Sequence, residues 1–250
     1  MCGRFTLTTA SDAVRAFFSY TDVEPFPARY NIAPTQPVMI VRTQSTVRQS
    51  ALVRWGFLPS WVKDPGEFSL LINARSETAA TKPSFKSAMK HRRCLFPVSG
   101  YYEWLRTPEG KQPYYISPAD GGVMGVAGLW ETWCDPDGGD IDTALLMTTP
   151  ANRQLSIIHH RMPAIIRPED FDVWLDTGNP RQADARSLLR PFEDGFLNAV
   201  PVSTRVNNAA FDDSQLIEPI PLEECIAVPK PSAKASTATK PKSSAQLDLF

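Results

Sequence analysis

The second residue of the chain, Cys2, has the type and position with the most specific chemistry. Removal of Met1, which a small second residue permits, would expose a thiol and an α-amine on adjacent carbons. Their ordinary pKa values, about 8.5 and about 7.7–8.0, leave both groups partly deprotonated near neutral pH. Such an aminothiol condenses with an aldehyde to an imine and then to a five-membered thiazolidine ring. Taken alone, a cysteine after Met1 is also an incidental small residue, so this chemistry needs support from the rest of the chain.

The other cysteines, Cys94, Cys134 and Cys225, are scattered and form no Cys-x-x-Cys pair. This spacing is typical neither of a disulfide framework nor of a zinc site, and it fits a reducing cytosol best. The start of the chain has no apolar segment typical of a signal peptide, and no run approaches the ~20 apolar residues that span a bilayer. We expect a cytoplasmic, nucleoid-associated protein with no metal and no cofactor.

The net charge of −1 conceals an uneven distribution of charge along the chain. Residues 1–106 carry 14 Lys and Arg against 7 Asp and Glu, whereas residues 107–228 carry 8 against 19. Residues 229–250 carry four Lys and one Asp. This asymmetry favours a local basic surface that binds phosphates. The alternative is that the charges interleave once the chain folds, and charge alone does not separate the two interpretations.

The apolar pattern predicts many short strands and a few short helices. Apolar runs bounded by turn residues indicate strands, and helical spacing indicates helices, with Ser11 as the expected N-cap of the first. The 250 residues, 42% of them hydrophobic, suffice for one substantial core. We predict a single α+β domain over residues 1–228, with a curved, mostly antiparallel, barrel-like sheet and short helices. The predicted strands are 4–7, 37–41, 46–55, 94–105, 113–116, 123–130, 143–148, 162–166 and 199–202, and the predicted helices are 11–18, 84–90, 152–158, 168–175 and 183–189.

The last 22 residues, 229–250, differ in composition from the rest of the chain. Residues 229–245 contain only Pro, Lys, Ser, Ala and Thr, which cannot bury enough apolar surface to offset their ordering entropy. We therefore expect a flexible tether. It ends in Gln246, Leu247, Asp248, Leu249 and Phe250, which resemble the short peptide by which bacterial proteins bind the replicative sliding clamp. Leu247, Leu249 and Phe250 supply apolar contacts and Gln246 a hydrogen bond in such a peptide, although the alternative is an incidental apolar end.

Eight segments of the chain together resemble the SOS-response-associated peptidase (SRAP) family, whose members shield abasic sites in DNA. Their order and spacing carry the resemblance over roughly residues 2–222. The segments are MCGRF at 1–5, YNIAP at 30–34, RWGFLPSW at 54–61, INARSET at 72–78, CLFP at 94–97, GYYEW at 100–104, HHRMP at 159–163 and VSTRVNN at 202–208.

The resemblance implies four catalytic residues. Cys2 is the implied nucleophile, and the aldehyde of a ring-opened abasic deoxyribose is its partner. Asn73 matches the family's active-site asparagine, whose neutral amide both donates and accepts hydrogen bonds and so orients the amine without adding charge. Glu103 matches the family's glutamate, which transfers protons during amine attack. His159 matches by register the histidine that promotes opening of the sugar ring, although His160 is adjacent.

Each supporting residue has an ordinary structural interpretation as well. Asn73 also suits a turn after an apolar run, Glu103 an exposed strand position, and His159 the surface after a helix. Strand alternation directs Tyr102 and Trp104 away from the face of Glu103, so it does not settle whether Glu103 is buried.

The resemblance also implies a surface that contacts DNA. Arginine suits phosphate because its planar fork bonds two oxygens at once. Trp61 is the implied aromatic wedge, and such stacking contributes about 1–3 kcal/mol per base whatever the base. Some relatives carry a second tryptophan where this chain has Val62, which leaves the strength of wedging open, and we interpret Trp55 as a core residue. The implied DNA-binding residues are Arg4, Pro34, Trp61, Arg75 and Thr148.

These features predict a monomer that shields abasic sites in single-stranded DNA through a single-use thiazolidine crosslink at Cys2. The predicted partners are that DNA and the sliding clamp, with no membrane. One alternative is a peptidase that uses Cys2 as an N-terminal nucleophile and removes its own Met1. Another is a non-covalent single-strand binding module, which would need the basic groove but not Cys2. Weak lyase activity at abasic sites is a further expectation, because an imine there permits β-elimination.

Overall fold

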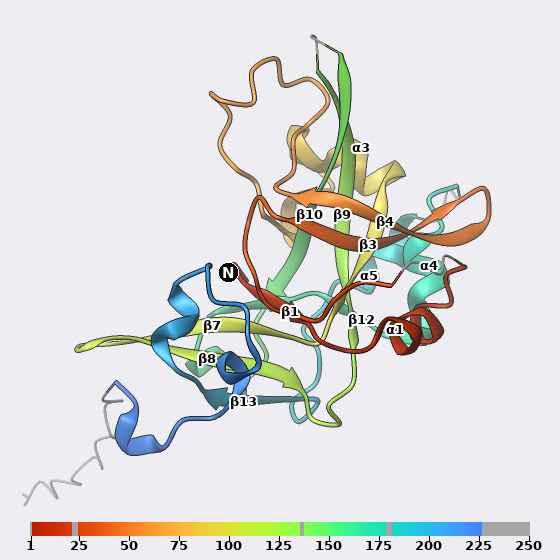
Figure 1. Ribbon diagram of the computed structural model, residues 1–250. Helices are drawn as coiled ribbons and strands as arrows, with labels where there is room; N and C mark the ends of the chain where they lie inside the picture. The colour runs from red at the N-terminus through yellow and green to blue at the C-terminus, as the bar shows by residue number, and fades with distance from the viewer. Residues whose placement is uncertain (1, 22–24, 136–137, 179–181, 227–250) are drawn as a thin grey trace, which may run out of the picture.

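The computed structural model describes residues 2–21, 25–135, 138–178 and 182–226 (Figure 1). The tether and the expected clamp-binding peptide at 246–250 lie outside the described residues, as does the expected domain boundary at 228. In the described part of the chain, no helix is both long and apolar enough to cross a membrane.

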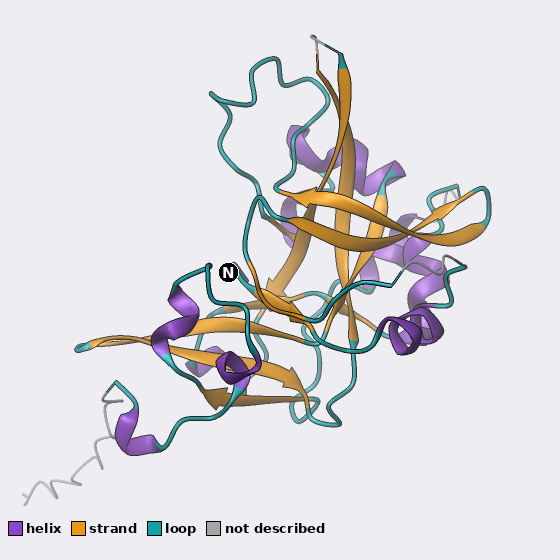
Figure 2. Cartoon of the chain, in the orientation of Figure 1, coloured by secondary structure: helices purple, strands orange, loops and turns teal. Residues whose placement is uncertain are grey.

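Five strands close into a barrel (Figure 2). Around the barrel, β4 (Val47–Trp55) pairs with β3 (Pro37–Gln44), β3 with β6 (Arg93–Val98), β6 with β9 (Met124–Asp135), and β9 with β10 (Gly139–Pro150). The barrel closes because β10 also pairs with β4, in parallel, whereas the other four pairs are antiparallel. Every barrel strand therefore has a neighbour on both sides.

Three short strands extend the barrel sheet. Strands β5 (Asn73–Arg75) and β11 (Arg161–Pro163) pair with the end of β10, and β12 (Ile165–Ile166) pairs with β9. The segments that carry Asn73 and His159 are therefore attached to the same barrel strand.

A second, five-stranded antiparallel sheet lies beside the barrel, in the order β13-β8-β7-β1-β2. The strands are β1 (Phe5–Leu7), β2 (Arg29–Ile32), β7 (Gly100–Thr107), β8 (Gly110–Pro118) and β13 (Leu197–Pro201). Strand β1 is held on both sides, by β7 and by β2. In Figure 1 the β7–β8 hairpin extends away from the body of the molecule, and the N-terminus lies between this sheet and the barrel.

Phe5 on β1 joins the two sheets. Its ring makes edge contacts with Trp55 of β4, at 5.1 Å between ring centroids, and with Phe96 of β6, at 6.2 Å. All three side chains are buried, and Trp55 is fully inaccessible, as its interpretation as a core residue predicts. Because aromatic side chains bury large apolar areas, this contact fixes the N-terminal segment against the barrel.

The helices are short and cover the outside of the barrel. They are α1 (Ser11–Phe18), α2 (Ser76–Ala79), α3 (Pro83–His91), α4 (Phe171–Leu175) and α5 (Gln182–Ser187). Single turns of 3-10 helix occur at η1 (Leu155–Ile157), η2 (Pro168–Asp170), η3 (Thr204–Asn207), η4 (Ser214–Ile217) and η5 (Leu222–Glu224).

The predicted α+β class with a barrel-like, mostly antiparallel core is confirmed, with local corrections. The run predicted as one strand at 94–105 is two strands in different sheets, because the chain crosses between sheets at Ser99, whose hydroxyl accepts hydrogen bonds from the N–H groups of Thr8 and Thr9. The helix predicted at 152–158 is only the η1 turn, and the Asn152 side chain caps this turn by accepting the Leu155 N–H. Ser11 is the first helical residue and not the cap, which is Ala10 without a side-chain bond.

We expect Gly100→Ala to lower the free energy of unfolding by about 1–3 kcal/mol, as overpacking does. A methyl group at Gly100 would overlap the phenol ring of Tyr115, whose hydroxyl is fixed by Thr6 at 3.0 Å. Gly139→Ala is the matched control, because a methyl group there meets nothing within 4 Å. Urea denaturation of the three proteins measures the effect, and equal stability of the two variants would contradict the close approach of Tyr115.

Candidate functional site

Cys2 lies in the N-terminal segment just before β1, and its side chain is 2% exposed. Its thiol donates weakly to the carbonyl oxygen of Arg4, at 3.7 Å. Burial raises the pKa of the Cys2 thiol well above its ordinary value, and the negative charge of Glu103 raises it further. The thiol is therefore protonated at neutral pH, and the Glu103 carboxylate lies close enough to affect its pKa.

Asn73 holds the backbone of Cys2 directly. Its Nδ2 donates a hydrogen bond to the Cys2 carbonyl oxygen, at 2.9 Å. Its Oδ1 is buried and has no hydrogen-bond partner among the described residues. A buried acceptor without a partner is costly, so this oxygen is suited to receive a donor, such as the amine of a processed Cys2.

The position of Asn73 is set by the barrel. The carbonyl oxygen of the preceding Ile72 accepts two hydrogen bonds, from the Trp55 indole and from the Leu146 N–H, each at 3.1 Å. Asn73 itself opens β5, which pairs in parallel with β10. The buried indole of a core residue therefore helps to fix the backbone from which the Asn73 side chain extends.

Glu103 and His159 come together from different elements. Glu103, on β7, is 4% exposed, and its Oε1 lies 3.8 Å from Nδ1 of His159, two residues after η1. The same Nδ1 lies 3.0 Å from the backbone nitrogen of Arg161 and 3.2 Å from its carbonyl oxygen, so the tautomer of the ring decides whether Nδ1 accepts or donates. Both side chains line an open pocket of about 460 Å³, which gives them access to a ligand.

An ion pair between the buried Arg161 and the partly exposed Glu77 connects the segments that carry Asn73 and His159. The Arg161 guanidinium bonds both Glu77 carboxylate oxygens on α2, and it also donates to the carbonyl oxygen of Thr148 at 2.6 Å. These hydrogen bonds lower the pKa of Glu77 to about 2. Sequence reasoning assigned no role to either residue. The sequence did contain one indication of this pair, because Arg161 directly precedes the apolar run 162–166. A charged residue next to a buried run is expected to need a partner of opposite charge.

His160 occupies the outer position beside His159. The two rings lie 4.3 Å apart, and His160 is exposed. The charge of His159 lowers the pKa of His160, with smaller contributions that include Arg161 and Arg75. His159, which faces Glu103, is thus the better placed of the two to act in the pocket, and the exposed Arg75 lies in the same electropositive neighbourhood.

Two of the expected DNA contacts have intramolecular partners in the structure. The half-buried Arg4 guanidinium donates to Asn31 Oδ1 and the Val206 carbonyl oxygen, both at 2.8 Å, and so ties the N-terminal segment to β2 and η3. The Thr148 side chain is fully buried, and its hydroxyl donates to the Ala74 carbonyl oxygen. Its burial leaves Thr148 no surface for a direct DNA contact, whereas the contact predicted for Arg4 stays a prediction.

The expected wedge, Trp61, is exposed on the loop between β4 and β5. Its side chain is 57% exposed and touches Phe68 edge-on, at 5.7 Å between ring centroids. The next residue, Val62, is buried, and its carbonyl oxygen accepts the Trp133 indole N–H at 2.7 Å. The loop is thereby anchored while the Trp61 indole stays available for stacking. Pro34, half-buried, lies on the turn between β2 and β3.

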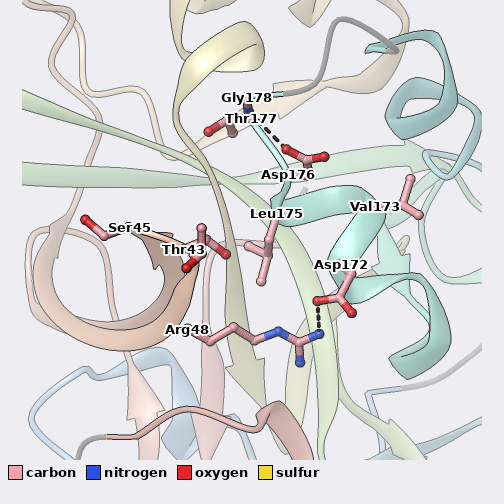
Figure 3. Close-up of a pocket in the computed structure, with 10 residues that line it drawn as sticks. Thr43, Ser45, Arg48, Asp172, Val173, Leu175, Asp176, Thr177 and Gly178 are labelled. Carbon is pink, nitrogen blue, oxygen red and sulfur yellow. Dashed lines mark hydrogen bonds and ion pairs between the residues drawn. The ribbon is translucent and has the colours of Figure 1, made fainter.

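A larger pocket lies elsewhere and contains none of the expected site residues. It measures about 750 Å³ and is lined by the β3–β4 turn and by α4 with the residues that follow it (Figure 3). The arginine in its lining, Arg48, is occupied by Asp172 at 2.6 Å and by the Phe18 carbonyl oxygen at 2.8 Å. Within the described ranges, no group of three or more His, Cys, Asp and Glu residues is arranged to hold a metal ion.

Comparisons with known proteins agree over most of the chain. Residues 1–209 match the family model described as "SOS response associated peptidase (SRAP)". The chain is 34% identical over 222 residues to the abasic site processing protein YoqW of Bacillus subtilis, covering 87% of this chain and 99% of that protein. It is 32% identical to the abasic site processing protein HMCES of Xenopus tropicalis, covering 84% and 75%. A crystal structure of a Bacteroides thetaiotaomicron protein superposes with a TM-score of 0.78 at 25% identity, covering 88% of this chain and all of that one.

We expect Glu77→Gln to lower the free energy of unfolding by about 1 kcal/mol at pH 7, because 46% of the Glu77 side chain is exposed and water screens the pair. The ion pair contributes fully above the ordinary carboxyl pKa of 4.5, and its contribution is lost as the pH falls toward about 2. The difference between wild type and variant should therefore shrink over that range. Glu193→Gln removes a surface pair with Arg167 and is the control. A difference independent of pH, measured by denaturation, would contradict the assignment.

Proposed function

The chain belongs to the SOS response associated peptidase family, and on this premise we propose that it shields abasic sites in single-stranded DNA through a covalent bond to Cys2. The observation that carries the proposal is the 2.9 Å hydrogen bond from Asn73 to the Cys2 carbonyl oxygen, which holds the N-terminal segment beside Glu103. Once Met1 is removed, the same contact would hold a free α-amine and thiol near Glu103, which lines the pocket together with His159.

The first step would open the abasic sugar. An abasic deoxyribose is a cyclic hemiacetal, and opening moves the proton of its C1′ hydroxyl to the ring oxygen and leaves an aldehyde. His159 suits proton delivery to the ring oxygen, because an imidazole gives up and takes a proton near neutral pH and this ring lines the pocket beside Glu103. Glu103, 3.8 Å from the ring, suits removal of the hydroxyl proton.

The second step would form the ring. The Cys2 amine adds to the aldehyde carbon, one water leaves, and an imine remains. The thiol sulfur then adds to the imine carbon while the imine nitrogen gains a proton, so that one C–N and one C–S bond form for one water lost. The Cys2 thiol is protonated in its buried position, and Glu103 is the neighbouring group that can relay its proton. Asn73 Oδ1 is an acceptor for the ring N–H.

The burial of Cys2 bears on the hydrolytic alternative. Peptide hydrolysis by cysteine proceeds through the thiolate, and burial together with the charge of Glu103 opposes that form. Capture of an aldehyde by the amine does not require a thiolate at the start. We therefore propose crosslinking as the main activity, and removal of Met1 and lyase activity as secondary reactions of the same residues.

Protein with a free Cys2, confirmed by mass spectrometry, should form an adduct with single-stranded DNA that contains one abasic site. The adduct should survive a denaturing gel without borohydride, because the thiazolidine resists reversal better than an imine. Cys2→Ser should lose the stable band, since its oxazolidine is weaker, and Cys134→Ser, which changes an exposed cysteine, is the control. Equal crosslinking by Cys2→Ser and wild type would refute the mechanism. No band from wild type would refute the proposed function.

We further propose that the C-terminal peptide binds the sliding clamp. Deletion of residues 246–250 should abolish a weak interaction between the intact protein and the purified clamp, measured by surface plasmon resonance, and leave crosslinking unchanged. The reason is that Leu247, Leu249 and Phe250 are the large apolar side chains of an otherwise polar tail. Replacement of Ser243 and Ser244 by Ala is the control, and equal clamp binding by the truncated protein would rule the interaction out.

A further inference from the structure

The pocket that contains Glu103 and His159 continues outward along the β7–β8 hairpin. Besides these two side chains it is lined by Trp104, Arg106, Lys111 and Asn207. Its volume of about 460 Å³ lies in the range of pockets that hold drug-sized ligands. An abasic deoxyribose has no base and would fill only part of this space, so the outer part is available to a neighbouring group.

The outer part carries two positive charges close together. Arg106 and Lys111 face each other across the hairpin as a cross-strand pair, and both are exposed. In the described parts of the chain, neither side chain forms an ion pair or a side-chain hydrogen bond. Like charges directly opposite each other in a sheet destabilise it. An anion bound between them would remove this cost, and a phosphate fits both side chains.

The wall next to these charges is aromatic. Trp104 packs against the small cluster of Tyr102, Tyr115, Val202, Val206 and Leu216, and it also lines the pocket. Its indole N–H donates to Asn207 Oδ1 at 2.8 Å, which fixes the ring and occupies its donor. A fixed indole whose donor is occupied offers a stacking surface that does not discriminate among bases.

We propose that the outer part of this pocket binds the nucleotide next to the abasic one, with its phosphate at Arg106 and Lys111 and its base against Trp104. This inference rests on the proposed function, because it names a second subsite of the same DNA strand. The protein would then bind the abasic sugar and the adjacent intact nucleotide at the same time. The β7–β8 hairpin would supply the side chains that hold the adjacent nucleotide.

The test uses Arg106→Gln/Lys111→Gln, with Arg15→Gln/Arg186→Gln as the control. The control removes two charges from α1 and α5, on the other side of the molecule from the hairpin (Figure 1). Binding is measured by fluorescence anisotropy at several salt concentrations, with single strands that carry a tetrahydrofuran residue, an abasic analogue without an aldehyde. The slope of log affinity against log salt should become shallower by about 0.7 for each phosphate that the variant no longer neutralises. The control should match wild type.

A second measurement tests the base contact. Replacing the base-bearing neighbour by a further tetrahydrofuran residue, on one side of the analogue at a time, should weaken wild-type binding about fivefold or more on one side only. Trp104→Leu should abolish that difference, and Trp104→Phe, which keeps a stacking ring, should retain part of it. Unchanged affinity, salt slope and neighbour dependence in the variants would overturn the subsite. Failure of the proposed function has a different result, namely no covalent adduct from wild-type protein with aldehyde-bearing DNA.

Discussion

The insertion of the three-residue strand β1 between β7 and β2 is the constraint on which the site depends. The Arg4 carbonyl oxygen accepts the Tyr102 N–H at 3.0 Å, and one residue later Phe5 enters the aromatic contact with Trp55 and Phe96. Only two residues separate Cys2 from Phe5, which belongs to the second sheet and packs against the barrel. A chain end normally frays, and here hydrogen bonds on both edges and a buried ring prevent it. Cys2 gains a fixed position without lying on a helix or a long strand.

The supporting residues come from segments distant in sequence, and Asn73 and His159 are each held through polar contacts of neighbouring buried groups. Asn73 depends on the hydrogen bond from the Trp55 indole to Ile72, and His159 on the backbone of Arg161. Arg161 in turn is 7% exposed and is stabilised by Glu77 and by the carbonyl oxygen of Thr148. Because a buried charge is costly without its partner, this ion pair couples the placement of α2 to that of β11. The placement of Asn73 and His159 is therefore a property of the barrel.

The sequence predicted the fold class and the elements with clear periodicity, such as the helix 11–18, because their burial follows a repeating pattern. It did not predict β2 and β5, which are four and three residues long and include polar residues, since tertiary pairing and not local preference makes them strands. Motif resemblance named the four residues of the candidate site, and the structure brings them together. Pattern reasoning missed the Glu77–Arg161 pair, which links residues 84 positions apart, and it could not tell that Thr148 is inaccessible. Contacts of this kind depend on the closed barrel, which no local window of sequence contains.

The burial of the Cys2 thiol also bears on how long the protein keeps its capacity to react. Peroxides and disulfides attack thiolates, and the raised pKa of this thiol keeps it in the form that they attack slowly. Exposed Cys134, by contrast, is open to such reagents. If Cys2 reacts only once, as proposed, a molecule oxidised before it reacts is lost. In the proposed mechanism, the burial of Cys2 in the hydrophobic core would therefore protect the protein from losing its capacity to react before it meets DNA.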